Sequence, residues 1–135
     1  MKKIYCFFLL LCITLSSYAQ VIQLPEPQKI SCMEIISHSH YDHESEKYVM
    51  DNNYIGEIIV FNYGKNKITV IGNDYFIDTN NVSFKVDGEI FIYKYPITNR
   101  KGERGVIYKL VSPGGVSYIV ICGRNADLYD VKDLQ

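Results

Sequence analysis

The sequence predicts an all-β protein, a single small antiparallel meander of about seven or eight strands that forms a barrel or a sandwich. Three observations predict this class. The chain contains 12 Tyr and 6 Phe, no Trp and many Ile and Val, and aromatic and β-branched residues favour strands. Apolar and polar residues alternate, most clearly from Val82 to Asp87, as in a half-buried strand. Turn residues separate the apolar segments by short connections, which is typical of a meander.

Residues 1–19 are predicted to be a signal peptide rather than part of the fold. Two lysines precede an apolar stretch at residues 4–15, and the small residues Ser17 and Ala19 mark a cleavage site. The apolar stretch is too short to cross a bilayer, which argues against a membrane anchor. The leader resembles those of Gram-negative bacteria. It predicts an exported protein, periplasmic or extracellular, with no membrane span after cleavage.

The remaining chain predicts one domain. Residues 20–29 contain Pro25 and Pro27 and predict an extended lead-in. Residues 30–135 form a single β domain, because a chain of 135 residues accommodates one core. An apolar fraction of 47% excludes a disordered chain. Lys and Arg (14) do not outnumber Asp and Glu (15), which excludes a nucleic-acid partner recognised through bulk charge.

In the first half of the β domain, apolar runs are separated by polar and glycine-containing turns. The runs predict strands at residues 30–37, 55–63, 67–71 and 75–77. The turns between the later runs are Gly64-Lys65-Asn66, Gly72-Asn73 and residues 78–81.

The second half begins with the clearest alternation, at residues 82–86. Asp87-Gly88 then predicts a hairpin turn, because glycine accepts a positive φ. The return strand is expected at residues 89–95, followed by a polar loop and a strand at residues 106–110. Pro113-Gly114 has the residue order of a type II turn. The near-continuous apolar run at residues 116–122 predicts a well-buried strand.

Only the tail of the chain predicts a helix. Asn125 is a candidate N-cap. Leu128, Val131 and Leu134 recur at a spacing that places them on one helical face. The sequence therefore predicts a short C-terminal helix after the last strand.

Two cysteines, Cys32 and Cys122, follow the leader. They lie in the first and last predicted strands, and an oxidising compartment allows such a pair to form a disulfide. A bond between them would make those strands neighbours and would close a barrel. The alternative is a pair of buried free thiols. Neither cysteine has a nearby histidine in the sequence that could act as its base, which argues against a catalytic thiol.

All three histidines of the chain lie in one short segment. His38, His40, Asp42 and His43 form the pattern H-x-H-x-D-H and are the candidate metal ligands, because imidazole and carboxylate groups bind Zn²⁺ or Cu²⁺. The pattern resembles the metal-binding signature of the metallo-β-lactamase fold. That resemblance implies that His38 and His40 ligate one zinc ion and that Asp42 and His43 ligate a second. It also implies that the zinc activates a water molecule for hydrolysis.

The rest of the chain departs from that family. The family needs further His and Asp ligands from downstream loops, and this chain has no fourth His. The family domain is an αββα sandwich, whereas this sequence predicts a meander. Glu44, Glu46 and Lys47 mark the flank of the cluster as solvated. We therefore expect the histidines to lie on an exposed connection between the first two strands, where truncation costs little stability.

These observations favour a binding protein over an enzyme. The sequence contains no glycine-rich phosphate loop and no nucleophile elbow. We expect a non-catalytic binding or accessory protein of the cell envelope or exterior, with no cofactor. Its partner would be an envelope protein, a glycan or a small ligand. The alternative is a metal-binding protein or zinc-dependent hydrolase that uses the histidine cluster.

Overall fold

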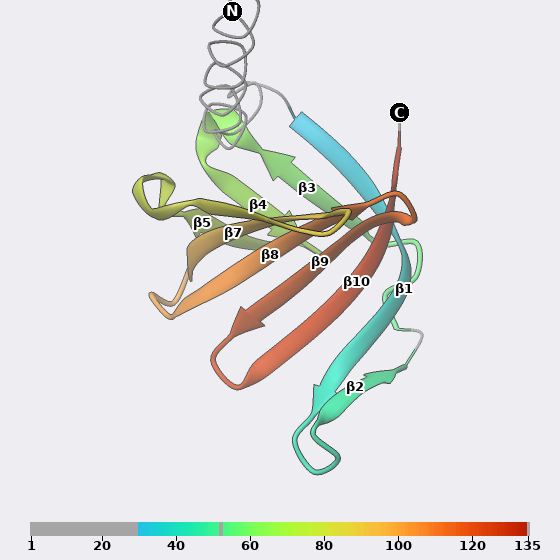
Figure 1. Cartoon of the computed structure of the whole chain (residues 1–135). Coiled ribbons are helices and arrows are strands. Elements are labelled where there is room, and N and C mark those ends of the chain that lie inside the picture. Colours follow the sequence, from blue (N-terminus) through green and yellow to red (C-terminus); the bar gives the residue numbers. More distant parts are fainter. Residues whose placement is uncertain (1–29, 52, 135) are drawn as a thin grey trace, which may run out of the picture.

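The computed structural model describes residues 30–51 and 53–134, and these ranges are built almost entirely from antiparallel strands (Figure 1). This confirms the all-β class. The strands of the first half are β1 (Ile30–Asp42), β2 (Lys47–Met50), β3 (Ile58–Asn62), β4 (Lys67–Val70) and β5 (Asn73–Ile77). Those of the second half are β6 (Ser83–Asp87), β7 (Ile90–Asn99), β8 (Arg104–Ser112), β9 (Gly115–Cys122) and β10 (Asn125–Asp133).

Two short 3-10 helices, η1 (Tyr63–Lys65) and η2 (Thr79–Asn81), are the helical segments of the described ranges. Neither has the length and apolar composition that crossing a membrane would require. The predicted signal peptide at residues 1–19 and the lead-in at residues 20–29 lie outside the described residues.

The sheet closes on itself, which makes the fold a barrel rather than a sandwich. Eight strands follow one another in the order β10-β9-β8-β7-β5-β4-β3-β1, and β1 then pairs with β10. The closing ladder is antiparallel and runs from Met33 opposite Asp133 to His40 opposite Asp127. Barrels of this size have an interior that side chains can fill or that can hold one small ligand.

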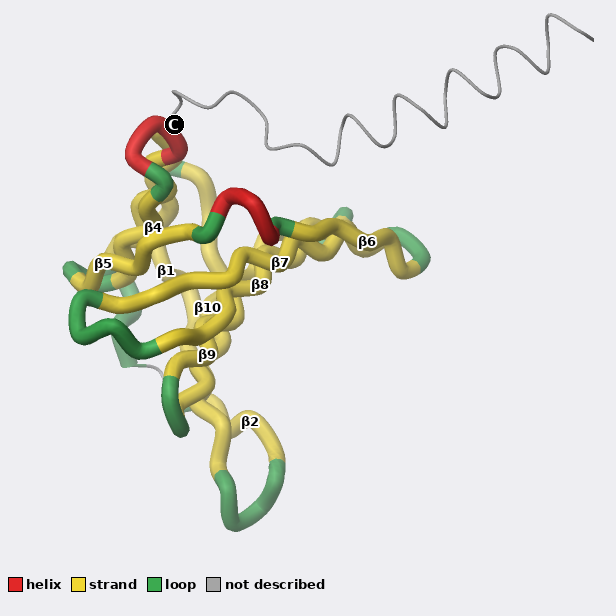
Figure 2. Tube along the Cα trace, turned by 90° about the vertical axis from the view of Figure 1, so that its left-hand side faces the viewer, coloured by secondary structure: helices red, strands yellow, loops and turns green. Residues whose placement is uncertain are grey.

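The two remaining strands form hairpins outside the barrel wall. β2 pairs with the last residues of β1, and β6 pairs with the first half of β7. Both hairpins project from the barrel (Figure 2). The predicted turn at Asp87-Gly88 is present: Asp87 pairs with Ile90, and Gly88 has a φ of 61°, a conformation that glycine adopts without strain.

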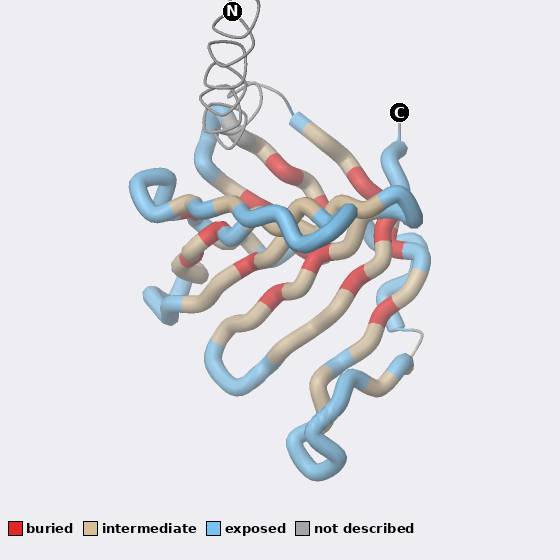
Figure 3. Tube along the Cα trace, in the orientation of Figure 1, coloured by how far each residue is buried: buried red, intermediate tan, exposed pale blue. Residues whose placement is uncertain are grey.

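Along the barrel strands, buried residues alternate with more exposed ones (Figure 3), and nearly all of the buried residues are apolar. The largest fully buried side chains are Tyr95, Tyr118, Ile35, Ile59, Ile68 and Ile107.

The predicted C-terminal helix is wrong, because these residues form strand β10. Tyr129 and Val131 are buried, and both point into the barrel at the two-residue spacing of a strand. β10 pairs with β9 on one side and with β1 on the other. Without it, both of those strands would expose an unpaired edge. Pairing along both edges outweighs the weak helical pattern of three leucine and valine residues.

The predicted disulfide is also wrong, since Cys32 and Cys122 are both free. β10 lies between their strands, β1 and β9. Cys122 pairs with Asn125 at the start of β10, whereas the backbone N–H of Leu134, just after β10, donates to the carbonyl of Cys32. The cysteines thus lie at opposite ends of a strand that spans roughly 30 Å at about 3.3 Å per residue. A disulfide requires Cα atoms within about 7 Å. The barrel closes through the β1–β10 ladder instead.

Candidate functional site

His38 and His40 lie on strand β1 rather than on an exposed connection, so that expectation is wrong for His38, which is only 2% exposed. A β-bulge between Ile35 and Ser37 explains the difference. The bulge makes Ile36 an extra residue, which points outward and is exposed. The alternation of the strand therefore shifts by one residue, and His38 follows Ile35 into the barrel.

Both ring nitrogens of His38 face carboxylates. Nδ1 lies 2.5 Å from Oδ1 of Asp51, and Nε2 lies 2.9 Å from Oδ1 of Asp127. A neutral imidazole has only one N–H donor, so the imidazolium form is the one that satisfies both contacts. The ring also stacks on Tyr129 at a centroid distance of 4.8 Å and meets the edge of Tyr54 at 5.0 Å.

Asp51 joins the two histidines of β1. Nδ1 of the exposed His40 donates to Oδ2 of Asp51 at 2.6 Å, while the other oxygen of Asp51 accepts from His38. Burial opposes the ionisation of Asp51. However, the N–H of Asn53 and the rings of His40 and His38 donate to the carboxylate and hold the pKa of Asp51 below its usual range. Asp51 therefore bridges the two histidines of β1 through its two carboxylate oxygens.

Asp42 and His43, the other two candidate metal ligands, are held elsewhere. Asp42 accepts hydrogen bonds from the hydroxyl of Ser45 at 2.8 Å and the N–H of Glu44 at 3.2 Å, and these bonds lower its pKa. Nε2 of His43 bonds to the carbonyl of Arg124 at 2.8 Å. Within residues 30–51 and 53–134, no group of three or more His, Cys, Asp or Glu side chains is arranged to hold a metal ion. The four residues of the motif thus do not converge.

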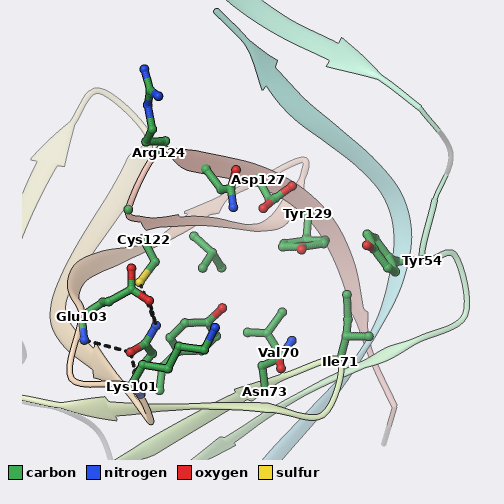
Figure 4. A pocket seen from close by; sticks show the side chains of 15 residues that line it. Tyr54, Val70, Ile71, Asn73, Lys101, Glu103, Cys122, Arg124, Asp127 and Tyr129 are labelled. Atoms are coloured by element: carbon green, nitrogen blue, oxygen red, sulfur yellow. Dashed lines mark hydrogen bonds between the residues drawn. The ribbon is translucent and has the colours of Figure 1, made fainter.

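One open end of the barrel contains a cavity of about 550 Å³, which we call the cup (Figure 4). The cup is lined by Tyr54, the end of β4 and the β4–β5 turn, the first residues of β5, the end of β7 and the β7–β8 loop, the end of β9 and the β9–β10 turn, and the first half of β10. Polar groups dominate this lining. They include the amides of Asn73, Asn99 and Asn125 and the carboxylates of Glu103 and Asp127.

Asp127 connects the cup to the histidine cluster. Its side chain lines the cavity, and its Oδ1 is the partner of His38. Tyr54 and Tyr129 line the cup next to it and also contact the ring of His38. The buried histidine is therefore a positioning residue behind the wall of the cup rather than part of its surface.

The opposite wall is a loop that is folded onto Asn99. The side-chain oxygen of Asn99 accepts hydrogen bonds from the backbone N–H groups of Lys101 at 3.0 Å and Glu103 at 2.9 Å. Its amide nitrogen donates to Oε1 of Glu103 at 3.1 Å and lies 3.6 Å from the sulfur of Cys122. These bonds fix the β7–β8 loop in one conformation. Burial, and next the charge of Glu103, raise the pKa of the Cys122 thiol.

Two residues of the rim have left-handed backbone conformations that are unfavourable for their side chains. Tyr54 has a φ of 65°, and Ile71, a β-branched residue, has a φ of 51°. Both residues line the cup. Such strain costs on the order of 1–3 kcal/mol per residue and concentrates at functional sites. Glu46 and Asn66 also have positive φ values and lie outside the cup lining, so this strain alone does not identify the cup as a site.

No protein-family model, curated protein or solved structure matches this chain. Its function therefore has to be argued from the cup and its surroundings.

Proposed function

We propose that this protein is an exported, non-catalytic binding protein that holds a small polar ligand in the cup. The observation that carries the proposal is a cavity of about 550 Å³ at the end of a closed barrel. Small-molecule sites have volumes of roughly 300–1,000 Å³ and occur in the mouths of β-barrels. The hydrogen-bonded β7–β8 loop and the His38–Asp127 contact make the cup largely preformed, which lowers the entropy lost on binding.

The residues that line the cup favour one of the expected partners, which were an envelope protein, a glycan or a small ligand. Amide and carboxylate groups from Asn73, Asn99, Asn125 and Asp127 converge with aromatic rings. Amides and carboxylates satisfy hydroxyl and amine groups, while tyrosine rings provide flat apolar surfaces. This combination fits a saccharide unit or another polar molecule of similar size. A small apolar ligand would leave the polar groups of the cup desolvated without partners.

The chemistry of the cup supports binding rather than catalysis. Among the described residues that line the cup, Cys122 is the one cysteine. The raised pKa of the Cys122 thiol favours the protonated form, which is the weaker nucleophile. The polar side-chain partner of its sulfur is Asn99 rather than a histidine. His38 has carboxylate partners at both nitrogens and so is not placed to act as a base.

The cup can be tested with a blocking variant. Asn73 is exposed and lines the cup, so Asn73→Trp should fill it. Asn80 is exposed on η2, which is not part of the cup lining, so Asn80→Trp is the matched control. NMR titration of isotope-labelled protein with a set of small polar compounds should shift signals of cup residues, and Asn73→Trp alone should abolish these shifts. Binding that persists in Asn73→Trp, or shifts confined to the outer surface, would exclude the cup as the site.

Export is supported by the leader at residues 1–19. Intact-mass analysis of protein from the envelope or culture medium should give a chain that begins at Gln20. Recovery of the full-length chain from the cytoplasm alone would contradict this part of the proposal.

A further inference from the structure

The wall of the cup at Asp127 indicates a ligand of a particular charge. We infer that the cup selects ligands that carry a positively charged amine, which the carboxylate of Asp127 receives. This inference rests on the proposed function and specifies the ligand class for the same site.

The first observation is that only one of the two carboxylate oxygens of Asp127 has a hydrogen-bond partner among the described residues. Oδ1 of Asp127 accepts from Nε2 of His38, whereas its Oδ2 has no hydrogen-bond partner among the described residues. The Asp127 side chain is 29% exposed, and it lines the cavity. Because His38 also contacts Asp51, two carboxylates share one imidazole ring, which can carry at most one positive charge. This group of three therefore retains a net negative charge. An oxygen with negative charge is therefore presented to the cup in a fixed orientation.

The second observation is the aromatic surface around that carboxylate. Tyr54, Tyr75 and Tyr129 all line the cup. The faces of tyrosine rings attract ammonium groups within about 6 Å. Tyr129 is only 5% exposed, and its hydroxyl has no hydrogen-bond partner within the described chain. A hydroxyl group can both donate and accept a hydrogen bond, so this one is suited to bind a polar ligand at the wall of the cavity.

The electrostatic environment agrees with a cation. Burial first, and then the neighbouring charge of Asp127, raise the pKa of Tyr129. The second of these causes is the one that reflects negative charge at this wall. Neither of the two cations in the lining, Lys101 and Arg124, forms an ion pair with Asp127 among the described residues. Arg124 points away from the cavity in Figure 4, and Lys101 belongs to the opposite loop with Glu103.

The test uses pairs of compounds that differ in charge. The purified protein is titrated with a set of polar compounds in which each primary amine is accompanied by its N-acetyl derivative, including glucosamine with N-acetylglucosamine and putrescine with its diacetyl derivative. We expect each amine that shifts the cup signals to bind about tenfold more tightly than its neutral derivative, a ratio that corresponds to 1.4 kcal/mol. Asp127→Asn should remove this preference, so that each amine and its neutral derivative bind with similar affinity.

Glu103→Gln is the matched control, because it removes a carboxylate from the opposite wall of the same cup. It should preserve the preference for amines. Neutral compounds that bind the cup as tightly as amines, or a preference that survives in Asp127→Asn, would overturn this inference and leave the cup as a binding site. Failure of every compound to shift cup signals would instead overturn the proposed function itself.

A second variant keeps the inference testable if Asp127→Asn does not fold. Tyr54 lies in an exposed turn with a φ of 65°, a conformation that asparagine adopts more readily than tyrosine. Tyr54→Asn thus removes one ring from the cup and relieves backbone strain. We expect amine affinity to fall several-fold while the protein stays folded. An unchanged amine affinity in this variant would overturn the inference.

Discussion

The imidazole of His38 links the core of the barrel to the cup, because its Nε2 lies 2.9 Å from Oδ1 of Asp127. These two residues are 89 positions apart in the sequence and become neighbours because β1 pairs with β10. The pairing that closes the barrel is therefore also the one that builds the wall of the cup. Stability and ligand binding should be coupled through this contact.

His38→Ala should destabilise the protein by about 2–4 kcal/mol, because it removes a buried side chain and leaves two carboxylates without the ring that hydrogen-bonds to both. Denaturant unfolding at neutral pH measures the change. His43→Ala is the control: His43 is exposed, and its effect should stay within about 0.5 kcal/mol. If the two variants changed the free energy of unfolding equally, the burial of His38 would make no contribution to stability. The result expected here replaces the sequence-based view that all three histidines are dispensable for folding.

The parts of the fold that were predicted correctly depend on local pattern. The alternation before Asp87, the turn at Gly88 and the apolar run at residues 116–122 each correspond to an observed strand or hairpin. Strand β10 was missed because the same residues fit a helical and a strand period, and only the unpaired edges of β1 and β9 decide between them.

The site was harder to predict because it depends on distant pairing. Nothing in the sequence marks the bulge at Ile36, yet that one residue determines whether His38 points into the barrel. The cup draws its polar side chains from five separate segments, so no spacing motif could reveal it. Asn99 and Asp127 each look like ordinary polar loop or strand residues until the barrel closes.

Asp74→Asn should make the stability of the protein less sensitive to acid. A hydrogen bond from Arg100, and then one from the hydroxyl of Thr69, hold the pKa of Asp74 below its usual range. A lowered pKa in the folded state stabilises the protein above about pH 4, the ordinary value for Asp. That stabilisation is lost as the pH falls through the folded-state pKa, because the unfolded chain binds the proton first.

The measurement is the denaturant midpoint from about pH 7 down to about pH 3. At neutral pH the parent should have a higher denaturant midpoint than Asp74→Asn. The difference between the two midpoints should become smaller as the pH falls. Asp87→Asn, at the exposed end of β6, is the control, and its effect on the midpoint should be small at every pH. A gap for Asp74→Asn that widens in acid would contradict the assigned hydrogen bonds.

Cys32 and Cys122 should both be alkylated in denatured protein that has not been reduced, because the fold separates them by the length of β10. Peptide mapping after iodoacetamide treatment identifies each site. In the native protein Cys122 should react more slowly than in the denatured chain, since burial and Glu103 raise the pKa of its thiol. A cross-linked Cys32–Cys122 peptide would contradict the strand order.

Tyr118→Phe should stabilise the protein by about 1 kcal/mol, because a buried hydroxyl without a partner costs free energy. The Tyr118 side chain is fully buried, and its hydroxyl has no hydrogen-bond partner in the described part of the chain. Urea unfolding of both proteins measures the difference. Tyr108→Phe, at a half-buried tyrosine outside the core, controls for removing a hydroxyl. A loss of stability in Tyr118→Phe would show that the hydroxyl has a partner inside the barrel.

Gly105→Ala should destabilise the protein by about 2–3 kcal/mol, because the added methyl group overpacks a backbone contact. Gly105 lies on β8 opposite Cys122 of β9. A Cβ atom there would overlap the carbonyl oxygen of Ile121 and lie 3.0 Å from the Cα of Cys122. Backbone atoms of a central ladder cannot move away without breaking their own hydrogen bonds, so the strain is not relieved by a change of rotamer.

The same substitution at Gly114 is the matched control, since the nearest atom to its added Cβ would be the hydroxyl oxygen of Ser112 at 3.8 Å. Gly114→Ala should change the free energy of unfolding by no more than about 0.5 kcal/mol. Because Cys122 also lines the cup, Gly105→Ala should displace the end of β9 and weaken ligand binding as well as folding. Denaturant unfolding and the NMR titration together test both effects. If Gly105→Ala were as stable as Gly114→Ala, this result would contradict the close contact between the β8 and β9 backbones at Gly105.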